Sequence, residues 1–158
     1  MNISNGGSVN TRGLVLGHVG ESGPFGRSAG IVRVEGPGSQ LTAVNMHIGN
    51  YGDGTLLISQ GGRVANWYTL IGAERGGTGR ATVSGAGSLW TMTGETQVGG
   101  YGTGELLISD RGQVRTGSLA TIAALDSGSV GMVHVKDPGS IWDIASNLNM
   151  AVFSGQAT

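Results

Sequence analysis

Short stretches of alternating apolar and polar residues recur along the chain, and each stretch ends in a glycine-rich turn. Residues 98–109 repeat the pattern of residues 48–59, including the run Leu-Leu-Ile-Ser. A second similarity recurs at half that spacing, where a β-branched residue is followed by turn residues, a glycine and another apolar residue. Alternation with a period of two predicts β-strands. Units of about 25 residues that hold two or three such strands leave no room for a helix.

Two sets of apolar positions recur in every unit. The β-branched set comprises Ile3, Val34, Ile58, Val83, Ile108 and Val135, and the closing set comprises Leu16, Ile48, Ile71, Val98, Ile122 and Met150. One unit cannot bury its own apolar side, so successive units must stack and bring each set into an internal column. We therefore predict an all-β fold, a right-handed parallel β-solenoid (β-helix) of about six coils of roughly 25 residues.

Two other repeat folds fit less well. A β-propeller blade of roughly 40–50 residues matches the longer spacing but has no reason to repeat at half that length. A leucine-rich repeat needs a leucine and asparagine ladder that this sequence does not contain. Residues 119–125 could form a helical turn by themselves, but the repeat places Ile122 in a core column, so we expect a strand there.

The repeat also predicts local geometry. The turn glycines are Gly7, Gly38, Gly62, Gly87, Gly112 and Gly139. Proline precedes two of them, which is typical of a type II turn whose third residue needs a positive φ. We expect all six to share that φ, so that Gly112→Ala is strained. The same alignment makes Arg80 and Glu105 neighbours in adjacent coils.

Composition narrows the function classes. Glycine accounts for 32 of 158 residues, charged residues make up 12%, and the net charge is −1. The glycines have no period of three, which excludes collagen, and the near-zero charge gives no footprint for nucleic acid or anionic lipid. Cysteine is absent, so disulfides and thiol chemistry are excluded. No apolar run is long enough to span a membrane, and no export leader follows Met1, so a leader is expected outside these residues.

The run Val-Gly-x-x-Gly-x-Gly-x-Leu-x-Ile-x-x-x-Gly, followed by Ile-Gly and by Val-x-Gly-x-Gly-Ser-x-Trp, resembles a repeat of type V secretion autotransporter passenger domains. A similar repeat occurs in exosortase-sorted surface proteins. The resemblance covers residues 3–150 and departs at Gln40, at Leu41 and in an insertion around residues 18–28. It implies export through a Gram-negative outer membrane, display at the cell surface or release, and an adhesive role in virulence. Residues 1–158 would then be one solenoid segment of a longer passenger, separate from its signal peptide and translocator barrel.

Two groups of residues are candidate binding sites. The insertion is the one non-repeating feature, and coil-to-coil loops on solenoids often carry recognition, so we take His18, Glu21, Phe25 and Arg27 as a candidate binding loop. Trp90 and Trp142 share a repeat position two coils apart, and the alignment places Arg115 between them. If that position faces outward, the three form a cation–π surface stripe; if it faces inward, the indoles fill the core.

Catalytic and metal sites are not evident. His18, His47 and Glu21 could lie close together, but a fourth ligand is missing, so no metal or cofactor is expected. Asp53, Asp110, Asp126, Asp137 and Asp143 fall mainly at turns, where aspartate supports the backbone, rather than as a facing carboxylate pair. The Gly-x-x-Gly-x-Gly runs open strands, whereas a phosphate-binding loop opens a helix.

We therefore predict a non-catalytic structural and adhesive passenger segment, acting as a stalk or display surface. The expected partner is a host or cell-surface protein or glycan, without nucleic acid or direct membrane insertion. End-to-end self-association is expected as well, because uncovered solenoid ends template pairing. The alternative is a fragment of a β-helical polysaccharide-degrading enzyme, which clustered carboxylates in a groove would favour.

Overall fold

The structure, a computed structural model, describes residues 1–18, 27–123, 126–150 and 156–157, and all regular structure within them is β-strand. One sheet takes a single strand from each coil, in the order β1 (Asn2–Ile3), β3 (Ala29–Glu35), β5 (Asp53–Ser59), β8 (Thr78–Ser84), β11 (Thr103–Ser109), β14 (Val130–Val135) and β17 (Gln156–Ala157).

The second sheet takes the remaining strands. Its order is β15 (Ile141–Ile144), β12 (Gln113–Thr116), β9 (Leu89–Met92), β6 (Arg63–Asn66), β4 (Gln40–Ile48), β7 (Tyr68–Ile71), β10 (Thr96–Val98), β13 (Ala120–Ile122) and β16 (Leu148–Met150), with β2 (Ser8–Leu16) paired to β4. The long β4 is followed in each later coil by two short strands, because the chain bends between them.

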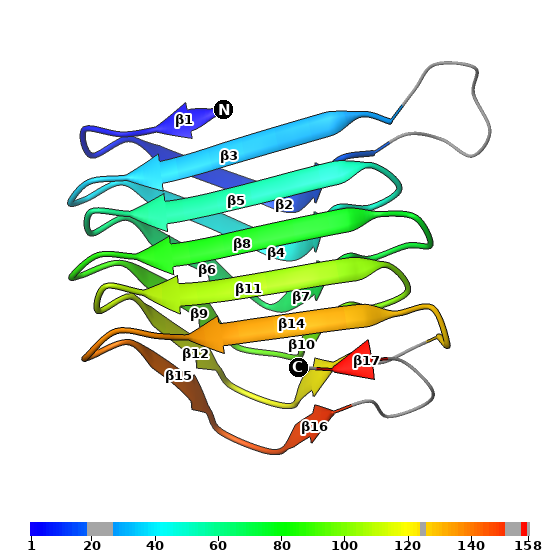
Figure 1. Cartoon of the computed structure of the whole chain (residues 1–158). Helices are drawn as coiled ribbons and strands as arrows, with labels where there is room; N and C mark the ends of the chain where they lie inside the picture. The colour runs from blue at the N-terminus through cyan, green and yellow to red at the C-terminus, as the bar shows by residue number, and fades with distance from the viewer. Residues whose placement is uncertain (19–26, 124–125, 151–155, 158) are drawn as a thin grey trace.

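The strands stack into a right-handed parallel β-solenoid, which confirms the predicted fold, with about five turns where about six coils were expected. Figure 1 shows β3, β5, β8, β11 and β14 crossing the front of the molecule in one direction, with the second sheet behind them. The described strand pairs are parallel throughout. Residues 119–125 contain β13 rather than a helical turn among their described members.

Both predicted core columns are present. The β-branched set is in register from Ile3 to Val135, and the closing set is in register from Leu16 to Met150. Their side chains are buried in every coil but the last. Arg80 and Glu105 are also register partners, with Nε and Oε2 3.4 Å apart, which confirms the predicted neighbours.

The corner after the first sheet has two alternating forms. Coils with Gly-Ser use a turn such as Gly36–Ser39, in which the Ser39 amide donates to the Gly36 carbonyl at 3.2 Å. Plain coils use a turn such as Ser59–Gly62, whose closing bond is 2.9 Å. The connection between the two sheets is one residue shorter in these coils, because Val34 pairs with Ile58 whereas Gln40 pairs with Arg63. The two forms interlock, because the serine hydroxyl of each Gly-Ser coil accepts the turn amide of the plain coil before it. These bonds join Ser39 to Gly6, Ser88 to Gly61 and Ser140 to Arg111, at 3.0–3.2 Å.

The expected positive φ at all six turn glycines is wrong for the plain coils. Gly38, Gly87 and Gly139 have it, but Gly112 does not, because the shorter connection of the plain coils moves the left-handed position one residue earlier. Gly112 is required for a different reason: a Cβ there would overlap the carbonyl oxygen of Val83 in the preceding coil. Gly112→Ala is therefore still expected to destabilise the fold, by crowding of the backbone rather than by dihedral strain.

In the plain coil around residues 109–112, the left-handed position is occupied by Arg111 at φ 69°. Gly6 and Gly61 occupy it in the other plain coils, at φ 78° and 88°. A side chain in this conformation costs about 1 kcal/mol, so Arg111→Gly is expected to raise the free energy of unfolding by up to about 1 kcal/mol. Chemical denaturation would measure it. Gly61→Ala is the matched reverse change and should lower that energy by a similar amount; equal stabilities for both variants would contradict this account.

The apolar columns are exposed in the last described coil. The interior columns end there at Val135, Leu148 and Met150, which are 47%, 45% and 52% exposed. A seventh coil begins with β17, which pairs with the start of β14. The first coil differs, because its column residues Ile3 and Leu16 are buried.

No helix within the described ranges is long and apolar enough to cross a membrane.

Candidate functional site

The predicted surface stripe does not exist. Trp90 is fully buried, and its partners in the neighbouring coils are Val64 and Val114. Trp142 also pairs with Val114 and packs against the core. Because the connection between the sheets is one residue shorter in plain coils than in Gly-Ser coils, counting from the turn glycine placed Arg115 one position off. The interior column instead alternates large indoles with small valines, and Arg115 is exposed on the outer face.

The buried indole holds a polar network together. Trp90 Nε1 donates to Asn66 Oδ1 at 2.8 Å, and Asn66 Nδ2 donates to the Tyr68 carbonyl at 2.9 Å and to Thr69 Oγ1 at 2.7 Å. Buried polar groups need such partners because an unmade bond is costly in a low-dielectric interior. The network fixes the bend between β6 and β7, and Trp67 lies at this bend.

Two members of the predicted binding loop, Glu21 and Phe25, lie outside the described residues. His18 contacts its neighbouring coil through Nδ1, which is 2.8 Å from Asn50 Nδ2, and its ring centroid is 6.3 Å from that of Tyr51. His47 is in register with Val15 and Leu70, so the structure does not bring the two histidines together. The described residues contain no group of three or more His, Asp or Glu that could hold a metal ion.

The fourth member of the predicted binding loop, Arg27, forms side-chain contacts with other residues of the same chain. Its Nη2 contacts Asp53 Oδ1 at 3.1 Å, the Gly76 carbonyl at 2.6 Å and Thr78 Oγ1 at 3.0 Å. These acceptors belong to the two following coils. Arg27 therefore links three coils along the outside of the solenoid, which is a structural role, although its side chain remains half exposed.

Sequence reasoning missed the most distinctive surface feature, an open hollow of about 420 Å³ beside the bend after β6. Its lining residues, called here the aromatic hollow, are Trp67, Tyr68, Thr93, Gly94, Glu95 and Ser118. The Trp67 side chain is 57% exposed. The Trp67 and Tyr68 rings are 6.1 Å apart and tilted by 44°. Trp67 does not occur in the repeat pattern, and an unrepeated tryptophan was the one signal that could have identified it.

The hollow is held by main-chain bonds between coils. The Gly94 amide donates to the Trp67 carbonyl at 2.8 Å, and the Thr69 amide donates to the Glu95 carbonyl at 3.1 Å. The indole lies directly against Gly94, where a Cβ would come 2.8 Å from Trp67 Nε1. Because Gly94 has no side chain, it leaves the space that the indole occupies. This contact fixes the position of the exposed ring.

The charged side chain that lines the aromatic hollow, Glu95, carries a negative charge. Burial raises the pKa of Tyr68 above its ordinary value, and the negative charge of Glu95 and the nearby Tyr101 raise this pKa further. The phenol therefore stays neutral around neutral pH, beside an exposed carboxylate. The lining of the hollow consists of two aromatic faces, one carboxylate and the hydroxyls of Thr93 and Ser118. Such a surface can accept hydrogen bonds and can stack on a planar group.

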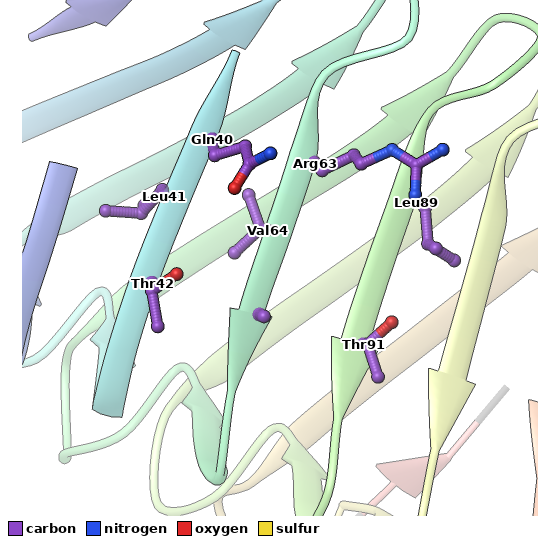
Figure 2. Close-up of a pocket in the computed structure, with 8 residues that line it drawn as sticks. Gln40, Leu41, Thr42, Arg63, Val64, Leu89 and Thr91 are labelled. Atoms are coloured by element: carbon purple, nitrogen blue, oxygen red, sulfur yellow. The ribbon is translucent and has the colours of Figure 1, made fainter. Parts of the chain in front are cut away.

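A second hollow of about 250 Å³ lies on the outer face of β4, β6 and β9 (Figure 2). Gln40, Arg63 and Leu89 are register partners and lie side by side, and the small Ala65 between Thr42 and Thr91 creates the depression. Gln40, which departs from the repeat pattern, thus faces outward, whereas Leu41 occupies the tryptophan column and is buried. This hollow is shallow and mixed in chemistry, without a convergent set of groups.

Several carboxylates are used for structure. Asp53 pairs with Arg27, Glu105 with Arg80, and Asp126 with Arg75 at 2.8 Å. Asp137 Oδ2 accepts the Asp110 amide across a corner, at 3.4 Å. The contacts of these groups connect coils or support turns.

The chain was also compared with protein-family models, with curated proteins and with solved structures, and none of them matches it.

Proposed function

We propose that the chain is a non-catalytic rod segment of an exported bacterial surface protein, which serves as a stalk or display surface with an adhesive role. The observation that carries this proposal is the uniform stacking of coils along the described chain. Ladder hydrogen bonds, interlocked corners and the Arg27 contacts all connect successive coils, so the fold is extended and rigid along one axis. Such a solenoid gains length simply by adding coils, and a stalk needs this property. The sequence resemblance to passenger repeats points the same way.

The runner-up function, a fragment of a polysaccharide-degrading solenoid enzyme, needs two carboxylates that flank one bond. Glu105, Asp53 and Asp126 engage basic side chains. The pair Asp110 and Asp137 meets at a turn corner beside Arg111, in a hollow that Ala86 and Pro138 also line. Because Asp137 also caps a backbone amide, the geometry favours a structural role for this pair.

Surface exposure on intact source cells tests the export proposal. An antibody against the chain should label intact cells, and protease added from outside should remove the label while a cytoplasmic control protein survives. Labelling that appears only after permeabilisation would overturn the proposal.

An assay of reducing-end release from acidic and neutral polysaccharides tests the alternative, and release that disappears in Asp137→Asn would favour the enzyme.

We also expect the 158-residue chain to self-associate through its open last coil. Leu148 and Met150 expose apolar surface that their equivalents Ala120 and Ile122 bury in the preceding coil, and exposed apolar edges drive pairing. Sedimentation across a concentration series should show larger species, and Leu148→Lys should reduce them. Val44→Lys is the control, because Val44 is equally exposed, at 46%, on β4, which has paired strands on both sides. A monomer at high concentration would refute this expectation.

A further inference from the structure

The chemistry of the aromatic hollow selects for a particular kind of ligand. Its six lining residues include two aromatic rings and one carboxylate but no basic side chain. Aromatic faces carry partial negative charge and attract cations within about 6 Å of the ring. The Glu95 side chain is exposed and takes part in none of the ion pairs formed between described residues. The hollow therefore combines two independent attractions for positive charge.

We propose that the aromatic hollow binds the guanidinium group of an arginine side chain presented by a partner protein. A guanidinium is planar, so it stacks on the Trp67 indole, and it carries five N–H donors in its plane. Those donors match the acceptors around the hollow, which are the Glu95 carboxylate and the hydroxyls of Thr93 and Ser118. A quaternary ammonium group would use the rings but has no proton to donate to these acceptors.

Preorganisation supports this assignment. The indole is seated against Gly94, and the bend that carries Trp67 and Tyr68 is fixed from inside by Asn66 and Trp90. Glu95 lies in the next coil, with its carbonyl bonded to the Thr69 amide. Binding therefore orders few groups that were free before, and such a site loses less entropy on binding. The inference goes beyond the proposed rod function and does not depend on where the rod is displayed.

A titration with a matched pair of probes tests the proposal on the whole chain. N-acetyl-arginine amide is added while the Trp67 indole N–H and the backbone amides of Gly94 and Ser118 are followed by NMR. N-acetyl-citrulline amide is the control probe, because it has the same shape without the charge. We expect saturable shifts with the arginine probe, with a Kd of about 1–10 mM, and at least fivefold weaker binding of the citrulline probe.

Variants identify the groups responsible. Glu95→Gln should weaken binding about two- to fivefold and remove most of its salt dependence. Trp67→Ala should weaken binding about fivefold or more, measured at the Gly94 and Ser118 amides. Asp143→Asn is the control, because it removes one exposed carboxylate from the outer face of β15 and should leave binding unchanged.

Three outcomes would overturn the proposal. Equal binding of the citrulline probe would make the hollow a general aromatic surface, and equal binding of choline would make it a general cation site. Shifts that maltose or cellobiose produces, and the arginine probe does not, would identify a sugar site instead. Surface labelling in the export experiment is a separate readout, so failure of one proposal leaves the other intact.

Discussion

Gly79→Ala is expected to lower the free energy of unfolding by about 3 kcal/mol or more. Gly79 belongs to an inward-facing glycine column and is in register with Gly54 and Gly104. A Cβ at this position would overlap both the Ile48 carbonyl oxygen and the Gly72 nitrogen. These two atoms form a 2.8 Å hydrogen bond that joins neighbouring coils at the opposite corner. The substitution therefore forces apart backbone atoms, which no side-chain rotation can relieve.

The same arrangement recurs in the next coil. Gly104 faces the hydrogen bond from the Gly99 amide to the Ile71 carbonyl, at 2.7 Å, and a Cβ would overlap both groups. Gly104→Ala is therefore expected to cost about as much as Gly79→Ala. Gly13→Ala is the control, since nothing lies within 4 Å of a Cβ there and its φ is ordinary. That change should be neutral or slightly stabilising. Thermal and urea unfolding would measure the stability of all three variants. An unchanged midpoint for Gly79→Ala would show that the backbone at the corners moves aside at little cost, which would contradict this prediction.

Trp90→Ala is expected to cost about 3–5 kcal/mol, whereas Trp67→Ala should change stability by less than about 0.5 kcal/mol. Trp90 is fully buried between two valines, so its removal leaves a large cavity. It also leaves Asn66 Oδ1 without its donor in the interior, which adds a desolvation penalty. Trp67 is mostly exposed, and its removal opens no cavity in the core.

Trp90→Phe separates the two contributions to this loss. Phenylalanine fills much of the volume but cannot donate to Asn66, so the remaining cost, of about 1–3 kcal/mol, should reflect the unpaired oxygen. Urea denaturation of the three variants would measure these differences. Similar losses for Trp67→Ala and Trp90→Ala would mean that the assignment of one indole to the core and the other to the surface is wrong.

The sequence by itself determined the architecture of this protein. Alternating polarity identifies strands, and a repeat of about 25 residues requires stacking, because one coil cannot bury its own apolar side. The columns that run from Ile3 to Val135 and from Leu16 to Met150 follow directly, and so does the neighbouring pair Arg80 and Glu105. These features depend only on relations that repeat from coil to coil, and such relations can be read along one chain.

The tertiary structure alone decided the alignment around the corners and the position of the aromatic hollow. One residue more in the connection between the sheets of each Gly-Ser coil shifts the following strand by one position, and a one-residue shift exchanges the inner and outer faces of a strand. Arg115 and Val114 were therefore exchanged in the sequence alignment. Apolar character could not separate Trp90 from Trp67 either, because an indole suits a core and an exposed hollow equally well. The bend at Asn66 and the empty space above Gly94 placed one indole inside and the other outside, and both features arise only when neighbouring coils are in contact.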